Sequence, residues 1–261
     1  MKKILPLILL MSLISCKNNV QSTDVSEDWI QLFNGHDLED WNIKIAGYPL
    51  NENYANTFRV EDGLMKVRYE NYDTFTGQFG HIYYKQKFSK YKLRVEYRFV
   101  GEQAPGGEGW AYKNSGVMYH CQSPESIGLD QSFPVSLEGQ FLGGDDEGER
   151  STMNLCTPGT HVMINGQLVT QHCINSTSIT TRGEEWVTAE FVVYGDSLIH
   201  HLVNGDTVLT FTKPVIDGSQ VSEDFTLPDG FPVEEGYISL QSESHPIDFR
   251  KVKLLDLSED Q

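Results

Sequence analysis

Residues 91–100 read YKLRVEYRFV, and from Lys92 to Phe99 charged or polar and apolar side chains alternate. In a strand, successive side chains point to opposite faces, so the apolar residues here would share one face and the charged residues the other. The apolar set is Leu93, Val95, Tyr97 and Phe99, and the charged set is Lys92, Arg94, Glu96 and Arg98. The pattern predicts a half-buried strand of an antiparallel sheet.

The same alternation recurs along most of the chain. Residues 186–195 repeat it, and residues 198–211 contain two such runs joined by Asn204-Gly205, a pair that favours a tight hairpin turn. Asp62-Gly63 marks another hairpin, and residues 237–257 supply two closing strands. No segment has a sustained helical period, so we expect an all-β antiparallel sandwich of the jelly-roll type.

The length and composition favour one domain. The chain has 261 residues, of which 39% are hydrophobic and 22% charged, an ordinary globular balance. Residues 100–116 and 212–236 are too long and polar to be tight turns, and long loops in compact domains often carry function. Neither loop is biased enough to be a linker, so we expect a single sandwich domain over residues 29–261.

The first sixteen residues, MKKILPLILLMSLISC, have the form of an export signal. Two lysines precede an apolar run that is short for a membrane span. The ending Leu-Ile-Ser-Cys resembles a bacterial lipobox, which predicts a signal peptide over residues 1–15, lipidation of Cys16 and a polar tether over residues 16–28. An ordinary signal peptide is the alternative. With Cys16 lipidated, the protein is expected to be a cell-envelope lipoprotein. The periplasmic side is the default location, and the outer cell surface is the alternative location.

The formal net charge of −17 restricts the partners. No row of basic residues would neutralise successive phosphates, which argues against nucleic acid. The same charge disfavours anionic lipid surfaces, so we expect membrane contact through the lipid anchor only. A neutral ligand or a cation fits this charge better.

Three cysteines remain once Cys16 is set aside: Cys121, Cys156 and Cys173. An exported protein can form disulfides. We favour a Cys156–Cys173 bridge, because the sequence between them has the pattern of a hairpin that would bring its ends together. A zinc cluster is not expected, since no pair has Cys-x-x-Cys spacing.

Polar side chains recur at alternate positions of several predicted strands. In FPVSLEGQFLGG, residues 133–144, Glu138 and Gln140 would share one face, opposite Leu137 and Phe141. Further polar residues with this placement, or on adjoining loops, are Asn114, His120, Arg150, His161, Gln241, Glu243 and His245. One such pair is more often a solvated face, but their recurrence suits a sheet that binds the hydroxyl groups of a sugar.

Four segments carry a family resemblance: IQLFNGHDLEDWNI (residues 30–43), NSGVMYH (114–120), LEGQFLGG (137–144) and GYISLQSESHPIDFRKVKLLDL (236–257). They resemble the landmarks of the family long called domain of unknown function 1080, now described as 3-keto-disaccharide hydrolases. The resemblance runs from Trp29 to Leu257. It implies a concanavalin-like jelly roll and an exported enzyme acting on glycosides that a separate sugar 3-oxidoreductase has oxidised at C3.

This chain departs from the family pattern at two places. Many members carry a histidine shortly after the closing Leu-Gln, where this chain has Ser242-Glu243-Ser244-His245. Many also carry arginine at the position of His120. If those positions hold the catalytic base or a substrate anchor, this chain belongs to a subgroup of the family with shifted chemistry.

A ketone at C3 acidifies the hydrogen on C2, so a base can remove it and the group on C1 can leave. We expect Glu138 to be the base, His120 the acid or an alternative base, and Arg150 the group that stabilises the enolate. The expected substrate-binding residues are Asn114, Gln140, His161, Gln241, Glu243 and His245.

Other interpretations stay open at this point. No cofactor is assured, and the acidic run GGDDEGER (143–150) is either an exposed turn or a calcium site. A non-catalytic carbohydrate-binding module would use aromatic platforms such as Trp110. An ordinary two-carboxylate glycosidase is less favoured, because the chain lacks a Glu-x-Asp-x-Glu run. A purely structural surface protein is the last alternative.

Overall fold

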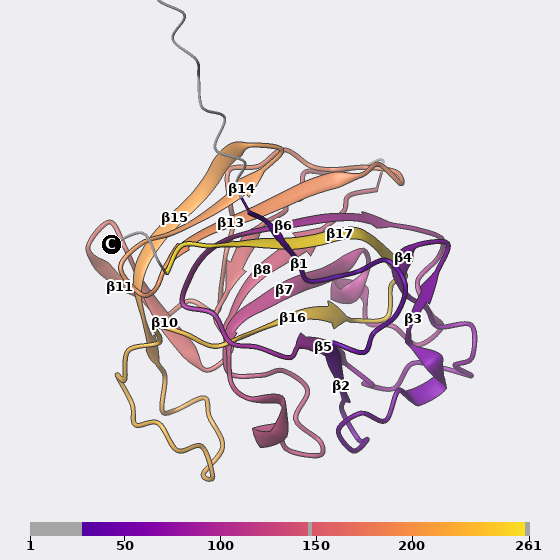
Figure 1. Cartoon of the computed structure of the whole chain (residues 1–261), viewed down its shortest axis with the longest axis horizontal. Coiled ribbons are helices and arrows are strands. Elements are labelled where there is room, and N and C mark those ends of the chain that lie inside the picture. Colours follow the sequence, from indigo (N-terminus) through magenta and orange to yellow (C-terminus); the bar gives the residue numbers. More distant parts are fainter. Residues whose placement is uncertain (1–27, 146–147, 259–261) are drawn as a thin grey trace, which may run out of the picture.

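Two antiparallel sheets packed face to face make up the computed structural model of the chain (Figure 1). The structure describes residues 28–145 and 148–258. The predicted signal peptide, Cys16, the tether up to residue 27, and Asp146 and Glu147 lie outside the described residues. The prediction of an all-β jelly-roll sandwich in one domain is confirmed.

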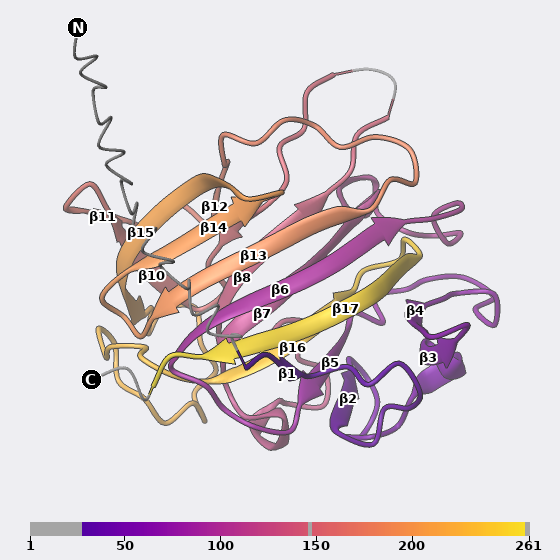
Figure 2. The same cartoon turned by 45° about the horizontal axis from the view of Figure 1, so that its top comes forward.

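The larger sheet has ten strands, all paired antiparallel. In spatial order they are β11 (Gln167–Val169), β10 (Thr160–Ile164), β15 (Asp206–Ile216), β14 (Ile199–Val203), β13 (Val187–Tyr194), β6 (Lys90–Phe99), β17 (Ile247–Asp256), β4 (Leu64–Val67) and β3 (Phe58–Glu61), with β1 (Ile30–Gln31) also paired to β17. The strands β13, β6 and β17 lie side by side at the front of Figure 2.

The smaller sheet has seven strands. Their order is β12 (Cys173–Ile174), β9 (Asn154–Cys156), β8 (Leu137–Leu142), β7 (Asn114–Cys121), β16 (Tyr237–Ser242), β5 (Gly80–Tyr84) and β2 (Trp41–Ile45). Three short 3-10 helices lie in the connections: η1 (Tyr54–Asn56), η2 (Gly109–Ala111) and η3 (Pro124–Ser126). Within the described ranges, no helix has the length and apolar character needed to cross a membrane.

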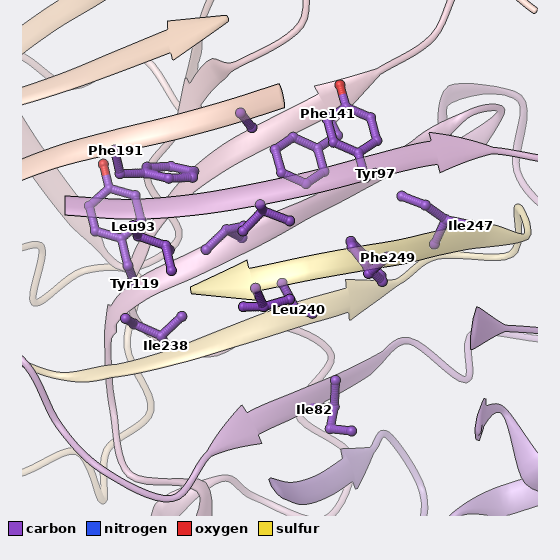
Figure 3. Close-up of a cluster of buried hydrophobic side chains, with 14 of the residues drawn as sticks. Ile82, Leu93, Tyr97, Tyr119, Phe141, Phe191, Ile238, Leu240, Ile247 and Phe249 are labelled. Atoms are coloured by element: carbon purple, nitrogen blue, oxygen red, sulfur yellow. The ribbon is translucent and has the colours of Figure 1, made fainter. Parts of the chain in front are cut away.

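The core fills the space between the two sheets (Figure 3). The apolar face expected from YKLRVEYRFV is buried, with Leu93, Val95 and Tyr97 fully enclosed. Leu240 from β16 and Phe249 from β17 are equally enclosed. The two-residue alternation of the sequence thus predicts correctly which face of β6 packs inward.

Strand β8 is fixed to the opposite sheet by an aromatic contact. The rings of Tyr97 and Phe141 are almost parallel, at 3°, with their centroids 3.9 Å apart. The Tyr97 hydroxyl also hydrogen-bonds Thr152 Oγ1 at 2.8 Å. Gly139, between Leu137 and Phe141 on the core side, lets β8 approach β13, because a Cβ there would lie 2.3 Å from Cε1 of Phe191.

Cys156 and Cys173 form a disulfide at one end of the smaller sheet. They face each other directly across β9 and β12. Between them β10 and β11 form a hairpin, as the intervening sequence indicates. Cys121 is buried and unbridged.

The contact of Gly139 with Phe191 yields a stability prediction. Gly139→Ala should lower the free energy of unfolding by about 1–3 kcal/mol, because the added methyl group overpacks the core. Urea unfolding followed by circular dichroism measures this change. Gly109→Ala is the matched control, since a Cβ at Gly109 meets no atom within 4 Å. Equal stability of the two variants would contradict the described packing.

Candidate functional site

Glu138 and Gln140 lie on the outer face of the smaller sheet, as the sequence predicts. Their neighbours Leu137 and Phe141 point into the core. The two polar side chains line a pocket of about 410 Å³, within the range of about 300–1,000 Å³ typical of small-ligand sites. Trp110 and Phe133 form apolar parts of its wall, and the two disulfide-bonded cysteines, Cys156 and Cys173, also line it.

Neighbouring strands bring further polar groups to the same face. Asn114 at the start of β7 and Glu243 just past β16 line the same pocket. Gln241, two residues before Glu243, shares its parity and is fully buried. The site therefore joins residues more than one hundred positions apart in the sequence.

A glycine makes room for the carboxyl group of Glu138. Gly116 of β7 pairs with Gln140 of β8. A Cβ at Gly116 would lie 2.7 Å from Oε1 of Glu138 and 3.1 Å from the carbonyl oxygen of Gly139. Any side chain here would displace the carboxyl group, so the floor of the pocket depends on this glycine.

Two carboxyl groups, those of Glu138 and Glu243, are buried together. Glu138 is 6% exposed and Glu243 is 3% exposed. Burial raises the pKa of Glu138 to about 8. Burial, and then the nearby charge of Glu138, raise the pKa of Glu243 well above its usual range, while Arg150 acts in the opposite direction. Such a pair is suited to hold one proton and one negative charge, as an acid and a base do.

Several buried polar atoms on this face have no hydrogen-bond partner among the described residues. They are Oε1 of Glu138, Oε2 of Glu243, Oδ1 of Asn114, and Oε1 and Nε2 of Gln241. Buried polar groups are nearly always paired in folded proteins, so a cluster of this kind indicates a polar ligand. Because the cluster holds both donors and acceptors, it suits hydroxyl groups, which can do both.

Gln140 and Asn114 are oriented by the protein. Oε1 of Gln140 accepts a hydrogen bond from Asn154 Nδ2 at 3.2 Å. This bond fixes which end of the Gln140 amide faces Asn154, so the amide nitrogen points away from Asn154. Nδ2 of Asn114 donates to the carbonyl oxygen of Trp110 at 3.3 Å. Both side chains are therefore set before any ligand arrives, which reduces the ordering cost of binding.

Arg150 lines the pocket, but its guanidinium group holds the backbone of a loop. It donates to the carbonyl oxygens of Tyr112, of Gly143 at 2.9 Å and of Trp110 at 3.1 Å. The side chain thus fixes helix η2 beside the carboxyl groups and adds positive charge near Glu243. This geometry favours a positioning role, in contrast to the direct contact with an enolate expected from the sequence.

The expectation that His120 faces the same way as Asn114 is wrong. Tyr237 pairs with Cys121 but Ser239 pairs with Met118, so β7 carries one extra residue there, and His120 has a φ of 49°. Such a bulge reorients the side chains at and beyond it. The His120 ring bonds to the Gly195 carbonyl oxygen at 3.2 Å, and burial lowers its pKa to about 4. The structure does not bring His120 to the carboxyl pair.

The other two predicted histidines lie outside the pocket lining. Nε2 of His161 is 3.2 Å from Oδ2 of Asp217. Both residues line a different groove, beside the larger sheet, so the structure does not bring His161 to the pocket of Glu138. His245 packs edge-on against Phe99 and Tyr112, and burial lowers its pKa to about 4. His245 supports the wall of the site, since Tyr112 is one of the residues that Arg150 holds.

Sequence reasoning missed three residues of this face. His81 pairs directly with Gln241 across β5 and β16, and burial lowers its pKa to about 3, so the ring is neutral. Phe79 stacks on Trp110, with centroids 5.7 Å apart, and packs against Phe133 at 5.1 Å. Residues 81–83 read His-Ile-Tyr, and with Ile82 facing the core a period of two turns His81 to the outer face. This alternation is the signal that could have indicated the position of His81.

The described part of the acidic run 143–150 shows no cluster of metal-ligating side chains. Glu149 accepts a hydrogen bond from Thr180 Oγ1 at 2.8 Å and lies 3.7 Å from Arg182. Among residues 28–145 and 148–258, no three His, Cys, Asp or Glu side chains come together as metal ligands. We therefore derive no step through a metal ion.

Another groove, of about 730 Å³, lies beside the long loop 217–236. Its lining includes Val135, Ile216 and Val233, which pack together as a small apolar cluster. It lacks the buried carboxyl pair, so we place the candidate active site in the pocket of Glu138 and Glu243.

Solved structures show the same fold. Two candidate glycosyl hydrolases from Parabacteroides distasonis ATCC 8503 align with TM-scores of 0.52. One is 18% identical and the alignment covers 88% of this chain and 99% of that one; the other is 19% identical, with 89% and 95% covered. The Crh5 transglycosylase in complex with NAG aligns at 0.51, with 10% identity and 88% and 84% covered. At these identities the likeness concerns the fold alone.

Comparison with curated proteins finds no match to this sequence. A family model does match: that of the 3-keto-alpha-glucoside-1,2-lyase-like domain, over residues 28–255. This range covers most of the chain and includes Glu138, Glu243 and every other residue of the pocket. The chain therefore belongs to the 3-keto-alpha-glucoside-1,2-lyase-like family.

Proposed function

We propose that this protein cleaves the glycosidic bond of 3-keto-glycosides by removing the proton on C2. Loss of that proton gives an enolate, the C1–oxygen bond breaks, and a C1–C2 double bond forms. Addition of water across this double bond would complete a net hydrolysis. Family membership supports a glycoside-processing role, and the ketone-dependent route is our proposal for this chain.

The observation that carries the proposal is the buried carboxyl pair in one pocket. Proton abstraction next to a ketone needs a base whose pKa is near the working pH. Burial gives Glu138 a pKa of about 8, far above that of an exposed carboxyl group. An ordinary solvated glutamate would be a much weaker base.

Glu138 and Glu243 take different roles. Glu138, once ionised, accepts the proton from C2. Glu243, whose pKa lies well above its usual range, stays protonated and donates its proton to the departing oxygen on C1. Glu243 thus replaces His120 as the acid, because the ring of His120 is buried against the Gly195 carbonyl oxygen, outside the lining of this pocket.

The amide side chains and the aromatic wall would hold the sugar. Asn114 and Gln140 line the pocket and suit ring hydroxyl groups, and Gln241 has unpartnered amide atoms on the same sheet face. His81 pairs with Gln241 on the same sheet, and its neutral ring has a buried Nε2 without a partner among the described residues, so His81 is our candidate donor to the developing negative charge. Preorganised donors of this kind stabilise an enolate oxygen, and the loss of one typically costs about 2.7–4 kcal/mol.

The proposal includes a setting for the reaction. A separate sugar 3-oxidoreductase must supply the ketone, because an unoxidised glycoside has no acidic C2 hydrogen. We also propose that Cys16 is lipidated and holds the protein in the cell envelope, with the periplasmic side as the default location.

A non-catalytic sugar-binding module is the second candidate. The observation that favours it is Trp110, which is 51% exposed and stacked on Phe79 at the pocket. Exposed aromatic rings bind the apolar faces of sugars. This alternative predicts binding of unmodified glycosides without bond cleavage.

A paired assay separates the two candidates. The purified chain is given an aryl glucoside and the corresponding 3-keto-glucoside, each with and without a chelator. We expect release of the aryl group from the keto substrate only. Binding of the plain glucoside, with no release from either, would replace the proposal with the sugar-binding alternative. Loss of turnover with chelator would show that a divalent metal such as calcium takes part.

Glu138→Gln should reduce turnover of the keto substrate by about 10²–10⁴-fold, since an amide cannot accept the C2 proton. Circular dichroism and thermal unfolding would show whether the fold is retained. Glu102→Gln, at an exposed glutamate in the loop 100–113, is the matched control and should leave turnover unchanged. Near-normal activity of Glu138→Gln would exclude Glu138 as the base.

The pH dependence of kcat/KM gives an independent test. A base works only when ionised, so kcat/KM should rise with pH through the pKa of Glu138, about 8. Glu243→Gln should lower the maximal rate but keep this midpoint, because glutamine resembles the protonated form of Glu243. A profile that falls across this pH range would contradict the assignment.

A further inference from the structure

The outer face of the larger sheet carries a charge opposite to that of the chain. Strands β6 and β17, side by side at the centre of that sheet, contain seven lysines and arginines and three acidic residues. The whole chain has a net charge of −17. The basic residues are Lys90, Lys92, Arg94, Arg98, Arg250, Lys251 and Lys253. Most of them alternate with buried core residues, while Arg250 and Lys251 are adjacent where the register of β17 shifts.

Two of the acidic residues lie beneath the basic ones. The side chain of Glu96 is 9% exposed, and it pairs with Arg250 and Lys251, which are 40% and 52% exposed. Asp248 is 2% exposed and pairs with Arg68 and Arg98. The cations therefore form the outermost layer, although several of them have acidic partners.

Two tryptophans lie on this same face. Trp29 packs under the cations of Arg94 and Lys253, at 5.0 and 4.4 Å from the ring centroid. Trp186 lies under Arg98 and Arg250, at 4.7 and 4.4 Å. Tryptophan together with basic residues is the composition typical of surfaces that contact lipid headgroups.

The expected tether leads to this face. Trp29 directly follows residues 16–28, and β1 begins at the next residue and pairs with β17. Thirteen extended residues reach at most about 45 Å, at about 3.3–3.6 Å per residue. The expected tether therefore joins the domain beside β17, at the edge of this face.

We propose that the outer face of β6, β13 and β17 lies on an anionic phospholipid surface. The sequence-based expectation relied on the net charge, but β6, β13 and β17 hold only four of the chain's 37 acidic residues and seven of its 20 lysines and arginines. The Debye length at physiological salt is about 8 Å, so charges on the far side are largely screened from lipid in contact with this face. The facing cations thus decide the interaction.

This orientation places the pocket on the side away from the membrane. The pocket of Glu138 and Glu243 lies on the outer face of the smaller sheet, opposite the basic face, and a separately produced sugar can reach it from solution. The proposal does not rest on the keto-glycoside chemistry, because it concerns the other sheet.

The test measures binding of the full chain carrying Cys16→Ser to vesicles. This variant has no acyl anchor, and its amino-terminal segment is common to all samples. Vesicles of phosphatidylcholine alone are compared with vesicles that also contain phosphatidylglycerol. We expect tighter binding to the anionic vesicles, and its loss at about 1 M salt, where the Debye length is about 3 Å.

A pair of double variants locates the effect. Lys92→Gln with Lys253→Gln should weaken binding to anionic vesicles by roughly thirty-fold, at about 1 kcal/mol for each residue. Lys85→Gln with Lys87→Gln removes the same charge from the loop after β5 and should change little. Both lysines of the control pair have exposed side chains.

Three results would overturn the proposal. One is equal binding of the parent chain to both kinds of vesicle, and another is an equal effect of the two double variants. The third is binding to a soluble acidic polysaccharide but not to anionic vesicles, which would make the partner a polymer rather than a membrane.

Discussion

The stacked rings of Tyr97 and Phe141 connect the two sheets and fix strand β8 between the core and the site. The ring centroids of Phe141 and Tyr97 are 3.9 Å apart in the core, while Glu138 and Gln140 of the same strand point to the opposite face. Because side chains of a strand alternate strictly, the position of Phe141 also fixes the direction of Glu138. Gly139 and Gly116 allow this placement, the first by its contact with Phe191 and the second by leaving room for the carboxyl group.

Desolvation then determines the chemistry of the site. A carboxyl group that loses water is harder to ionise, and two such groups close together resist a second negative charge. The pKa values of Glu138 and Glu243 both rise for the first reason, and that of Glu243 also rises through the charge of Glu138. The fold therefore places in one pocket two carboxyl groups that are harder to ionise than solvated glutamates, as the proposed base and acid require.

The sequence predicts those features that depend on regular alternation. The buried face of β6, the outward pair Glu138 and Gln140, and the face of Gln241 and Glu243 all follow from a period of two. His120 shows where this reasoning fails, because one bulge residue with positive φ changes the parity and no nearby glycine or proline marks it.

Contacts between loops are harder to predict than strand faces. The hold of Arg150 on the backbone of Tyr112 and Trp110 depends on loop paths that have no period. The connection that carries His161, on β10, to the larger sheet is equally aperiodic. The positions of charge are likewise a property of the fold. The net charge of −17 follows from the sequence alone. The clustering of basic side chains around Glu96 and Asp248 depends on how the strands pair in the sheet.

The central claim is that the hydrogen on C2 leaves before the glycosidic bond is cleaved, and isotope labelling tests it most directly. A 3-keto-glucoside carrying deuterium at C2 is turned over in ordinary water, beside an enzyme-free sample that corrects for spontaneous exchange. We predict slower turnover than with the unlabelled substrate and a sugar product without deuterium at C2. A product that keeps its deuterium, formed at an unchanged rate, would contradict proton abstraction and indicate direct displacement at C1.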